Sequence, residues 1–409
     1  MKSEKNLVIV GGGGHVGLPL GLVLAERGMQ VKLLDLDPER VAHINSGKMP
    51  FMEEGADELL RRLIHKSLIA TADPECLEHA DVVITVVGTP VDRHLNPNLN
   101  EVYRIMDGVI CRMKDDAILI LRSTVYPGMT KLVYDRIHKL GRNISLAFCP
   151  ERIAEGRALE ELLSLPQLVS AFEPRAMARA RELFLNLAPS VIELQPVEAE
   201  LAKLFANSWR YLNFAISNQF YILAQSYGLD FYRIYDAVRQ DYPRMKSFAR
   251  PGFAAGPCLL KDTLHLGAFA HNNFFLGHAA MLINEGLPNF IVEQLRRSEL
   301  STMRIAILGM AFKADSDDFR ESLSYKLKNL LLVEAAQVLC TDPYVTDDKL
   351  VPLEQAIANS DVIILGAPHT VYRDLNIPPE KAVIDIWNFW ASTRTPKMEF
   401  PPVTPATVA

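Results

Sequence analysis

The chain has 409 residues, of which 49% are hydrophobic and 22% charged, as expected for a globular protein of two or three domains. Lys and Arg number 43 against 49 Asp and Glu, giving a net charge of −6, so no general basic excess suits nucleic acid. No apolar run approaches the roughly 20 residues of a membrane-spanning helix, so no membrane span is expected.

The N-terminus and the cysteines bear on the compartment. The N-terminal residues pass from a charged start into a strand-like segment, without the apolar core or cleavage site of a signal peptide. The cysteines are odd in number, far apart and form no CxxC pair, which argues against a disulfide framework or a zinc site. A reducing, cytoplasmic compartment is therefore expected. The five are Cys76, Cys111, Cys149, Cys258 and Cys340.

The first third of the chain alternates short apolar segments with helical ones. Continuous apolar strands separated by helices predict a parallel sheet covered on both faces. Strands are expected at 7–10, 31–35, 81–87, 117–121 and 145–148, and helices at 16–27, 39–46 and 103–113.

A glycine-rich turn follows the first of these strands. Residues 12–17, Gly-Gly-Gly-His-Val-Gly, fit GxGxxG between a strand and a helix. Gly12 would make the tight turn, Gly14 would let a pyrophosphate approach the backbone, and Gly17 would let the helix pack on the strand. Asp35 ends the next strand and would bond a ribose 2′-hydroxyl. The pattern therefore predicts a dinucleotide site that prefers NAD to NADP.

The middle of the chain is expected to be helical. Residues 197–227 contain neither Gly nor Pro, and they predict one helix of about 30 residues, or about 45 Å. Further helices are expected at 230–239 and through 262–297. His265, His271 and His278 lie in this region without other ligand residues, so packing or exposure is favoured over metal binding.

The opening pattern returns near the C-terminus. Residues 303–313, 338–345 and 360–368 repeat the strand–turn arrangement of the first third, but without GxGxxG. A second α/β unit is expected, which holds a different ligand or none. The final residues are rich in Pro and Thr and predict a flexible tail.

Cys258 stands apart from the other cysteines. It follows a segment rich in Gly and Pro and precedes a helix, whose N-terminus would stabilise a thiolate. A thiolate can attack an aldehyde and hold it as a thiohemiacetal. On spacing alone, a small buried apolar residue explains Cys258 equally well. That second interpretation is the one expected for Cys76, Cys111 and Cys340.

Seven motifs, in chain order, resemble the nucleotide-sugar 6-dehydrogenase family, which includes UDP-glucose, UDP-N-acetylmannosamine and UDP-N-acetylglucosamine 6-dehydrogenases. They are GGGGHVGLPL (11–20), VVGTPVD (86–92), RSTVYPG (122–128), CPERIAEG (149–156), AELAKLFANSWR (199–210), PGFAAGPCLLKD (251–262) and GMAFKADSDDFRES (309–322). The resemblance implies an NAD-dependent enzyme that oxidises a sugar C6 alcohol twice, ending in a uronic acid of the kind used for polysaccharide biosynthesis.

The resemblance also implies a fold. Two Rossmann-like, doubly wound α/β domains would be joined by a long central helix and an all-α middle region that builds a homodimer. The expected division is an NAD-binding domain at 1–196, a helical dimerisation region with the catalytic cysteine at 197–300, a UDP-sugar-binding domain at 301–394 and a flexible tail at 395–409.

Catalytic roles carry over to positions that match the family's motifs. Cys258 matches the nucleophile. Lys203 and Asn207, which share one face of the long helix, match the pair that stabilises charge on the reacting oxygen. Asp262 matches the carboxylate that orients the catalytic water, and Glu151 matches the general base of thioester hydrolysis. Taken singly, Lys203 and Glu151 also fit surface charges, and Asp262 fits a charge at a helix N-terminus.

Ligand contacts carry over in the same way. Thr89 and Thr124 match cofactor-site residues, with Thr124 near the chemistry, beside the loop residues Gly12, Gly14, His15, Val16, Gly17 and Asp35. Arg244 matches an arginine that reaches the sugar nucleotide across the dimer, and Lys313 matches a substrate-contacting lysine. The substrate-binding residues expected are Glu151, Arg152, Lys203, Asn207, Arg244, Phe253, Gly256 and Lys313.

Two departures from the family pattern bear on activity. Ala255-Gly256-Pro257 replaces two glycines and a Ser or His before the cysteine, and Pro257 removes an N–H that could hold an oxygen. Trp387 stands where the family usually has an arginine after the last strand, which removes a cationic contact with the substrate.

The motifs also bear on the substrate and on rival functions. RSTVYPG, PERIAEG with Arg152, and Pro243-Arg244 resemble the N-acetylhexosamine branch, with N-acetylmannosamine favoured, whereas Lys261-Asp262 resembles the UDP-glucose branch. A non-catalytic protein that binds NAD or a nucleotide sugar is a second class of function. A two-electron hydroxyacid dehydrogenase is a third, although such an enzyme needs neither the cysteine nor a second Rossmann-like unit.

Overall fold

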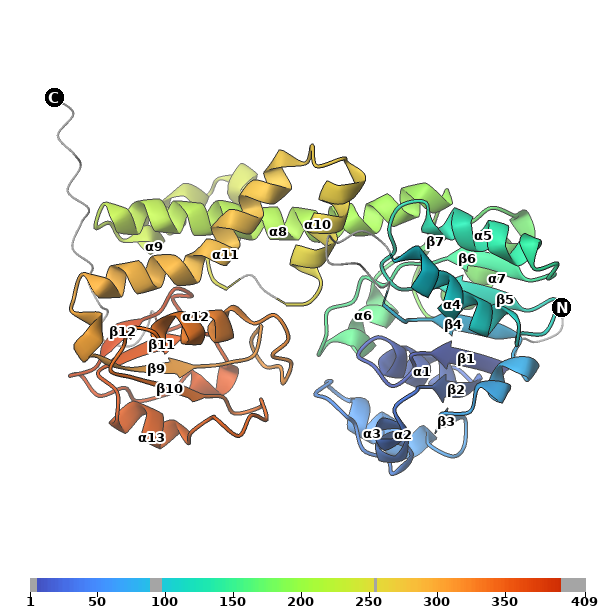
Figure 1. Cartoon of the computed structure of the whole chain (residues 1–409), viewed down its shortest axis with the longest axis horizontal. Coiled ribbons are helices and arrows are strands. Elements are labelled where there is room, and N and C mark those ends of the chain that lie inside the picture. Colours follow the sequence, from blue (N-terminus) through green and yellow to red (C-terminus); the bar gives the residue numbers. More distant parts are fainter. Residues whose placement is uncertain (1–5, 89–97, 254–255, 391–409) are drawn as a thin grey trace. The chain divides into compact units, whose positions relative to one another are not determined.

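The computed structural model describes residues 6–88, 98–253 and 256–390 (Figure 1). They form two compact units, Met1–Ala206 and Asn207–Ala409. The boundary falls inside the long helix α8 (Pro196–Ser226), whose 31 residues confirm the single helix predicted for 197–227.

The first unit is built on a sheet whose described strands follow the order β3-β2-β1-β4-β5-β6-β7-β8. All neighbouring strands are parallel except β6 and β7, which are antiparallel. The strands are β1 (Asn6–Val10), β2 (Gln30–Leu34), β3 (Leu68–Thr71), β4 (Val82–Thr85), β5 (Ile118–Leu121), β6 (Ser145–Phe148), β7 (Gln167–Ala171) and β8 (Val191–Leu194). The parallel sheet predicted for the first third is confirmed.

Helices cover both faces of this sheet, because its central strands are apolar on both sides. One face packs against α1 (Gly17–Glu26), α3 (Ala56–Leu63), α6 (Ala158–Ser164) and α7 (Pro174–Leu185). The other packs against α4 (Leu99–Ile110) and α5 (Met129–Lys139). A further helix, α2 (Pro38–Asn45), follows β2 and is capped by Asp37, whose side chain accepts the N–H groups of Glu39 and Arg40.

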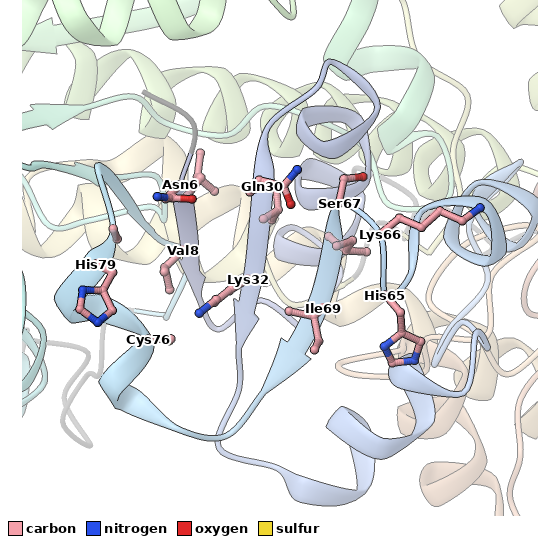
Figure 2. A pocket seen from close by; sticks show the side chains of 14 residues that line it. Asn6, Val8, Gln30, Lys32, His65, Lys66, Ser67, Ile69, Cys76 and His79 are labelled. Carbon is pink, nitrogen blue, oxygen red and sulfur yellow. The ribbon is translucent and has the colours of Figure 1, made fainter. Parts of the chain in front are cut away.

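The second face is less covered near β2 and β3, because only the short 3₁₀ helix η1 (Pro74–His79) follows β3. It leaves a hollow of about 280 Å³ lined by residues of β1, β2, β3, η1 and the turn before β3, among them Lys32, Lys66 and His79 (Figure 2). Cys76 lies at this hollow and is 8% exposed. Burial raises the pKa of its thiol to about 11, and the predicted burial of Cys76 is confirmed.

The second unit contains a smaller parallel sheet in the order β10-β9-β11-β12. Its strands are β9 (Arg304–Leu308), β10 (Gln337–Thr341), β11 (Val362–Leu365) and β12 (Ala382–Ile384), with helices α12 (Leu323–Leu331) and α13 (Leu353–Ala358). Short 3₁₀ turns also occur at η2 (Pro243–Met245), η3 (Leu300–Thr302) and η4 (Thr370–Tyr372). The predicted second α/β unit is confirmed, and with it the fold class of two Rossmann-like domains and a long central helix.

Helices α9 (Phe231–Arg239), α10 (Leu259–Phe269) and α11 (Phe275–Arg296) complete the second unit. The helical region predicted through 262–297 is interrupted between α10 and α11. His271 and Asn272 there have φ values of +51° and +62°, which no α-helix contains. Among the described residues, the helices lack the combined length and apolarity that crossing a membrane requires.

Candidate functional site

The glycine-rich loop between β1 and α1 is held by backbone packing. The N–H groups of Gly11 and Gly12 donate to the carbonyl oxygen of Leu34, at 2.8 and 3.0 Å. A Cβ on Gly17 would lie 2.7 Å from the oxygen of Gly11, so only glycine lets α1 begin against the loop. A Cβ on Gly14 would meet only that same oxygen, at 3.7 Å. Packing therefore explains Gly17, whereas Gly14 keeps its surface open to a ligand.

The start of α1 suits an anion. Its N-cap residue, Val16, supplies no side-chain hydrogen bond to the first turn. The first N–H groups of a helix lack intrahelical partners and carry the positive end of the helix dipole, which together attract phosphate. His15 stacks on Phe51 with ring centroids 4.0 Å apart, which fixes one side of the loop.

Asp35 lies directly after β2, where a ribose-binding carboxylate is expected. It is 8% exposed. Its Oδ2 accepts the N–H of Gly13 at 3.0 Å and lies 3.6 Å from Nη1 of Arg40, while Oδ1 accepts the N–H of Asp37 at 3.2 Å. The carboxylate is thus fixed against the loop that would hold the pyrophosphate. These residues fit NAD.

Thr124 lies half-buried in the loop between β5 and α5, and that loop is tied to α8. Glu200, in the first turns of α8, accepts the N–H groups of Gly128 and Thr130 at 2.6 and 2.8 Å, and the Thr130 hydroxyl at 2.6 Å. Gly128 caps α5 and has no side chain for the purpose, so Glu200 supplies the missing acceptor. The half-buried Lys203 follows on the same helix. Thr89, the other predicted cofactor residue, lies outside the described residues.

Glu151 belongs to a buried charge network rather than to the surface. It forms an ion pair with Arg122, whose side chain is fully buried. Arg122 also donates to the Cys149 carbonyl oxygen at 3.2 Å and to Oε1 of Gln167 at 3.0 Å. The other oxygen of Glu151 accepts the N–H of Arg152 at 2.7 Å. Both carboxylate oxygens therefore have donors.

Cys258 is the N-cap residue of α10 and is exposed. The N–H of Asp262, one turn along, donates to the Cys258 carbonyl oxygen at 2.9 Å. Asp262 is fully buried, and its Oδ2 accepts the side-chain amide of Asn207 at 2.6 Å. The structure thus joins two of the predicted residues directly and places the thiol one helical turn from them.

Aromatic rings of the second α/β unit hold the loop before Cys258. A Cβ on Gly256 would lie 2.6 Å from the ring of Phe312, which follows β9. A Cβ on Gly252 would collide with the ring of Trp387, which follows β12 and whose Nε1 donates to Leu365 O at 3.2 Å. Trp387, which replaces the expected arginine, thus packs against the cysteine loop. Ala255 lies outside the described residues.

The remaining predicted substrate residues differ in exposure. Arg244 is exposed in η2, with its guanidinium 5.6 Å from the Tyr242 ring, and Lys313 is half-buried, with Nζ 5.7 Å from the Phe312 ring. Arg152 is half-buried, and burial lowers the pKa of its guanidinium. Phe253 is 4% exposed and belongs to the apolar core of the second unit.

Cys149 and Cys111 differ in burial. Cys149 is fully buried, and burial raises the pKa of its thiol. The prediction of a buried residue was wrong for Cys111, which is exposed at the C-terminal end of α4. The apolar residues of α4 that pack on the sheet precede Cys111, which is the C-cap of the helix and does not belong to that core cluster.

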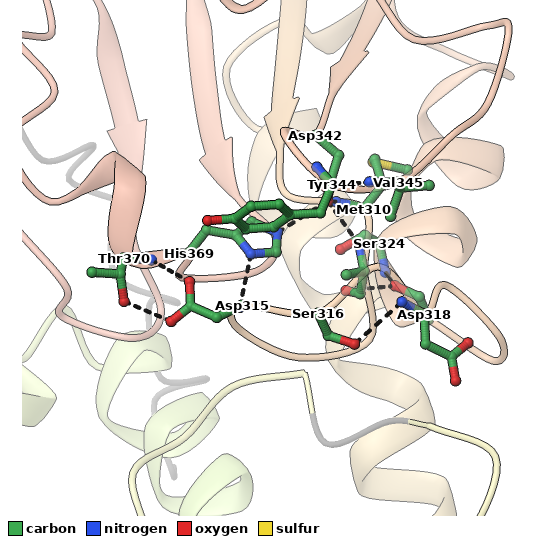
Figure 3. A network of polar contacts seen from close by, with 12 residues as sticks. Met310, Asp315, Ser316, Asp318, Ser324, Asp342, Tyr344, Val345, His369 and Thr370 are labelled. Atoms are coloured by element: carbon green, nitrogen blue, oxygen red, sulfur yellow. Dashed lines mark hydrogen bonds and ion pairs between the residues drawn. The ribbon is translucent and has the colours of Figure 1, made fainter. Parts of the chain in front are cut away.

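A buried polar network that was not predicted from the sequence lies at the carboxyl ends of β9, β10 and β11 (Figure 3). Asp342 and His369 are both fully buried, with Oδ2 and Nε2 3.0 Å apart. Nδ1 of His369 accepts the N–H of Asp315 at 2.9 Å, and both carboxylate oxygens of Asp315 accept from Thr370. An aspartate directly after the second strand of the unit was the one available signal, because Asp35 has the same position in the first unit.

Three models of one protein family match successive parts of the chain. Residues 5–188, 197–285 and 306–392 match models of the UDP-glucose/GDP-mannose dehydrogenase family, described as its NAD binding, central and UDP binding domains. A UDP-N-acetyl-D-mannosamine dehydrogenase of Pyrococcus horikoshii is 30% identical over 387 residues, covering 90% of this chain and 91% of that protein. The corresponding protein of Methanococcus aeolicus is 28% identical, covering 91% and 87%. A UDP-glucose dehydrogenase structure from Pyrobaculum islandicum is 25% identical and superposes with a TM-score of 0.87, covering 98% and 99%.

Proposed function

Because the chain belongs to the UDP-glucose/GDP-mannose dehydrogenase family and is an NAD-dependent UDP-sugar dehydrogenase, we propose that it oxidises the C6 hydroxymethyl group of its sugar to a carboxylate in two steps. The observation that carries this proposal is the exposed Cys258 at the N-cap of α10, one turn from the hydrogen-bonded pair Asn207 and Asp262. A two-electron alcohol dehydrogenase needs no such thiol.

The chemistry follows from the thiol. Loss of a hydride and a proton converts the alcohol to an aldehyde, and the Cys258 thiolate adds to the aldehyde carbon to form a thiohemiacetal. Loss of a second hydride leaves a thioester. Water then attacks the acyl carbon and the C–S bond breaks, which restores the Cys258 thiolate and releases the carboxylate, while the two protons of the water pass to the solvent. The loop at 11–17 and Asp35 would hold NAD, which would supply the hydride acceptor for both oxidations.

The charged residues divide the remaining work. An amide nitrogen carries two N–H groups, so Asn207 can donate to Asp262 and to a substrate oxygen together. With the Lys203 ammonium, it would stabilise negative charge on that oxygen. Asp262 would orient the attacking water. The contacts of Glu151 with Arg122 and the backbone favour an anion that fixes its loop over the predicted general base.

The domains divide the ligands. We assign NAD to residues 1–196, the catalytic cysteine and dimerisation to 197–300, and the UDP-sugar to 301–394. Arg152, Phe253, Gly256 and Lys313 are assigned to the substrate on the family motifs.

A UDP-N-acetylhexosamine, with N-acetylmannosamine first, is the substrate we favour. The relatives from Pyrococcus horikoshii and Methanococcus aeolicus carry that name, and Pro243-Arg244 and Arg152 point the same way. UDP-glucose is second, on Lys261-Asp262 and on the similarity to the Pyrobaculum islandicum structure.

A panel of nucleotide sugars tests the function. With the correct sugar and NAD, two NADH should form for each sugar consumed, and the product should be the acid. Cys258→Ser should bind both ligands yet form no acid, because a hydroxyl is a far poorer nucleophile than a thiolate. Cys111→Ser is the matched control, since it also removes an exposed thiol. One NADH per sugar, or normal acid formation by Cys258→Ser, would contradict the mechanism. No NADH with any sugar would favour a binding protein instead.

We also propose a homodimer built on α8. Trp209, Ile216, Phe220, Leu223 and Tyr227 recur at helical spacing along it and the residue after it, and each is between 46% and 62% exposed. A stripe of this kind on a helix usually marks a protein interface. The dimer would bring Arg244 to the partner's substrate. Light scattering should give twice the chain mass, and Phe220→Asp should halve it.

The five cysteines all lie within the described residues, and none forms a disulfide there. This suits the reducing cytoplasm, where we place the enzyme.

A further inference from the structure

His265 is a buried titratable residue without a role in the chemistry described above. It lies on α10 and is 1% exposed. Neither ring nitrogen has a hydrogen-bond partner within the part of the chain that the structure describes. Burial lowers the pKa of the imidazole, and Lys261 lowers it further, while Asp262 opposes both. A buried imidazole without a hydrogen bond is unfavourable. This suggests that the ring gains a partner at some step of the reaction.

The helix places this ring on the face that carries the reactive groups. At 3.6 residues per turn, positions 258, 262 and 265 of one helix fall along a single stripe. Side chains three residues apart on a helix are neighbours, at about 5–6 Å between Cβ atoms, so His265 lies next to Asp262 on the side away from Cys258. The electrostatic effect of Asp262 on His265 agrees with that proximity. The order along the stripe is therefore thiol, carboxylate, imidazole.

Asp262 lies between Asn207 and His265. Its Oδ2 accepts the Asn207 amide, and His265, which is also buried, lies one turn further along α10. A carboxylate that takes a proton from water in such an interior must pass it on before the next cycle. Glu151, the other predicted acceptor, is already paired with the buried Arg122. His265 is the buried base on the same helix as Asp262.

We propose that His265 is a positioning residue of thioester hydrolysis that acts through Asp262, and this role rests on the function proposed above. Water forms a C–O bond with the acyl carbon, the C–S bond breaks, and the electron pair returns to the Cys258 sulfur. One water proton goes to the Asp262 carboxylate and from there to a ring nitrogen of His265, and the other stays on the carboxylic acid. After the acid leaves, the imidazolium returns its proton through Asp262 to water in the emptied site, and the neutral ring is restored.

The test separates oxidation from hydrolysis. In His265→Phe, which keeps the ring size and removes both nitrogens, the unaltered oxidation steps should give a burst of two NADH per subunit. Steady-state acid formation should then fall about 100-fold, within the range of lost general acid–base catalysis. The thioester should accumulate on the Cys258 peptide and be visible by mass spectrometry. Hydroxylamine, which attacks a thioester without a base, should restore rapid NADH formation and yield the hydroxamate.

Controls make the result decisive. His278→Phe is the matched variant, because His278 lies on the neighbouring helix α11, beside Gly267, and outside the stripe. It should hydrolyse the thioester normally. His265→Gln, which keeps polarity, replaces His265→Phe if the latter does not fold. Equal slowing of the NADH burst and of hydrolysis, or failure of hydroxylamine to rescue, would reduce His265 to a packing residue.

The two proposals fail differently. If the unaltered chain makes two NADH per sugar and the His265 variants do the same at the normal rate, only the role of His265 is overturned. If the unaltered chain reduces no NAD with any nucleotide sugar, the function fails, and the role of His265 fails with it.

Discussion

The two α/β sheets of this chain share one backbone hydrogen bond at the end of their first strands, but the residues around that bond differ in purpose. The N–H of Gly11, directly after β1, donates to the carbonyl oxygen of Leu34, the last residue of β2, at 2.8 Å. The N–H of Gly309, directly after β9, donates to Thr341, the last residue of β10, at 2.9 Å. Both glycines have positive φ, +80° and +91°, so the chain leaves both strands in the same way.

The aspartate that follows the second strand differs between the sheets. Asp35 accepts two backbone N–H groups, from Gly13 and Asp37, and lies near the half-exposed Arg40. Asp342 accepts four backbone N–H groups and pairs with the buried His369. The first carboxylate pairs only loosely with Arg40, at 3.6 Å, which leaves it able to accept a hydroxyl group of a ribose. The second carboxylate uses both of its oxygens to hold the loops that follow β9 and β10.

The helix that follows the first strand also differs. In the first unit α1 begins at Gly17, and its N-cap Val16 offers no side-chain cap. In the second unit α12 begins only at Leu323, and its N-cap Ser322 accepts the N–H of Ser324. An uncapped helix close to the strand favours a phosphate, whereas a distant, capped one does not. Both units thus share a strand, a turn and an aspartate, and the position and capping of the following helix determine whether a phosphate can bind.

The largest effect on stability should come from a glycine that makes this shared hydrogen bond. Gly309→Ala should lower the free energy of unfolding by about 3 kcal/mol, because a Cβ in the left-handed region is strained and also clashes with backbone. That Cβ would lie 2.5 Å from the nitrogen and oxygen of Ala367. Chemical denaturation measures the loss. Gly28→Ala is the control, because Gly28 has φ +92° but open space around it, and strain alone should cost about 1 kcal/mol. Equal losses would mean that the clash is relieved.

The open side of Gly14 gives the next effect. Gly14→Ala should leave the melting temperature unchanged, since its Cβ meets nothing closer than 3.7 Å. It should raise the Kd for NAD about 30-fold, or about 2 kcal/mol, because the methyl group takes the place of the pyrophosphate. Fluorescence titration measures the affinity, and binding of the UDP-sugar should not change. Gly108→Ala, also in open space but on α4, should alter neither ligand. Normal NAD affinity in Gly14→Ala would remove the loop from the cofactor site.

These contrasts show which parts of the fold a sequence can predict. GxGxxG, the strand before it and Asp35 lie within a short segment, and each residue type has a local reason to be there. The long helix α8 was predictable because residues 197–226 contain neither Gly nor Pro. The break after α10 was not, since His271 and Asn272 adopt positive φ without glycine.

Contacts between distant residues were out of reach. Asp342 and His369 are 27 residues apart, and Glu200 binds a loop 70 residues away at Thr130. No periodicity reports such pairs, because they depend on how the strands are ordered in the sheet. The burial of Glu151 is of this kind as well: its motif suggested a base, and only the fold revealed Arg122 beside it.

Lowering the pH should show how much the ionised Asp342 side chain contributes to the free energy of unfolding. Burial would raise the pKa of this carboxyl, but the hydrogen bonds from His369, Tyr344 and Val345 outweigh it and lower the pKa from 3.8 to about 2. Because the folded pKa lies below the unfolded one, the stabilisation is complete above about pH 4 and is lost as the pH falls toward 2.

The contribution should be about 2 kcal/mol at neutral pH, which follows from the size of the pKa difference. Asp342→Asn should therefore be less stable than the unaltered chain at pH 6, and the gap should narrow by pH 3. Urea denaturation at the two pH values measures this. A gap that stays constant would mean that the charge of Asp342 does not matter to folding.

The smallest effect concerns the cofactor choice of Asp35. Its carboxylate would sit beside a 2′-phosphate, where like charges repel, and it lies 3.6 Å from Arg40. Asp35→Asn removes the repulsion and leaves Arg40 to pair with the phosphate, so the ratio of kcat/KM for NAD over NADP should fall about tenfold. Asp37→Asn is the control, since Asp37 also lies near Arg40, at 3.7 Å, and asparagine keeps its cap on α2. Steady-state rates with both cofactors measure the ratio. If both variants shift it equally, the general charge around Arg40 sets the preference; if neither does, Asp35 holds only the loop through Gly13, and the first sheet uses its aspartate as the second one does.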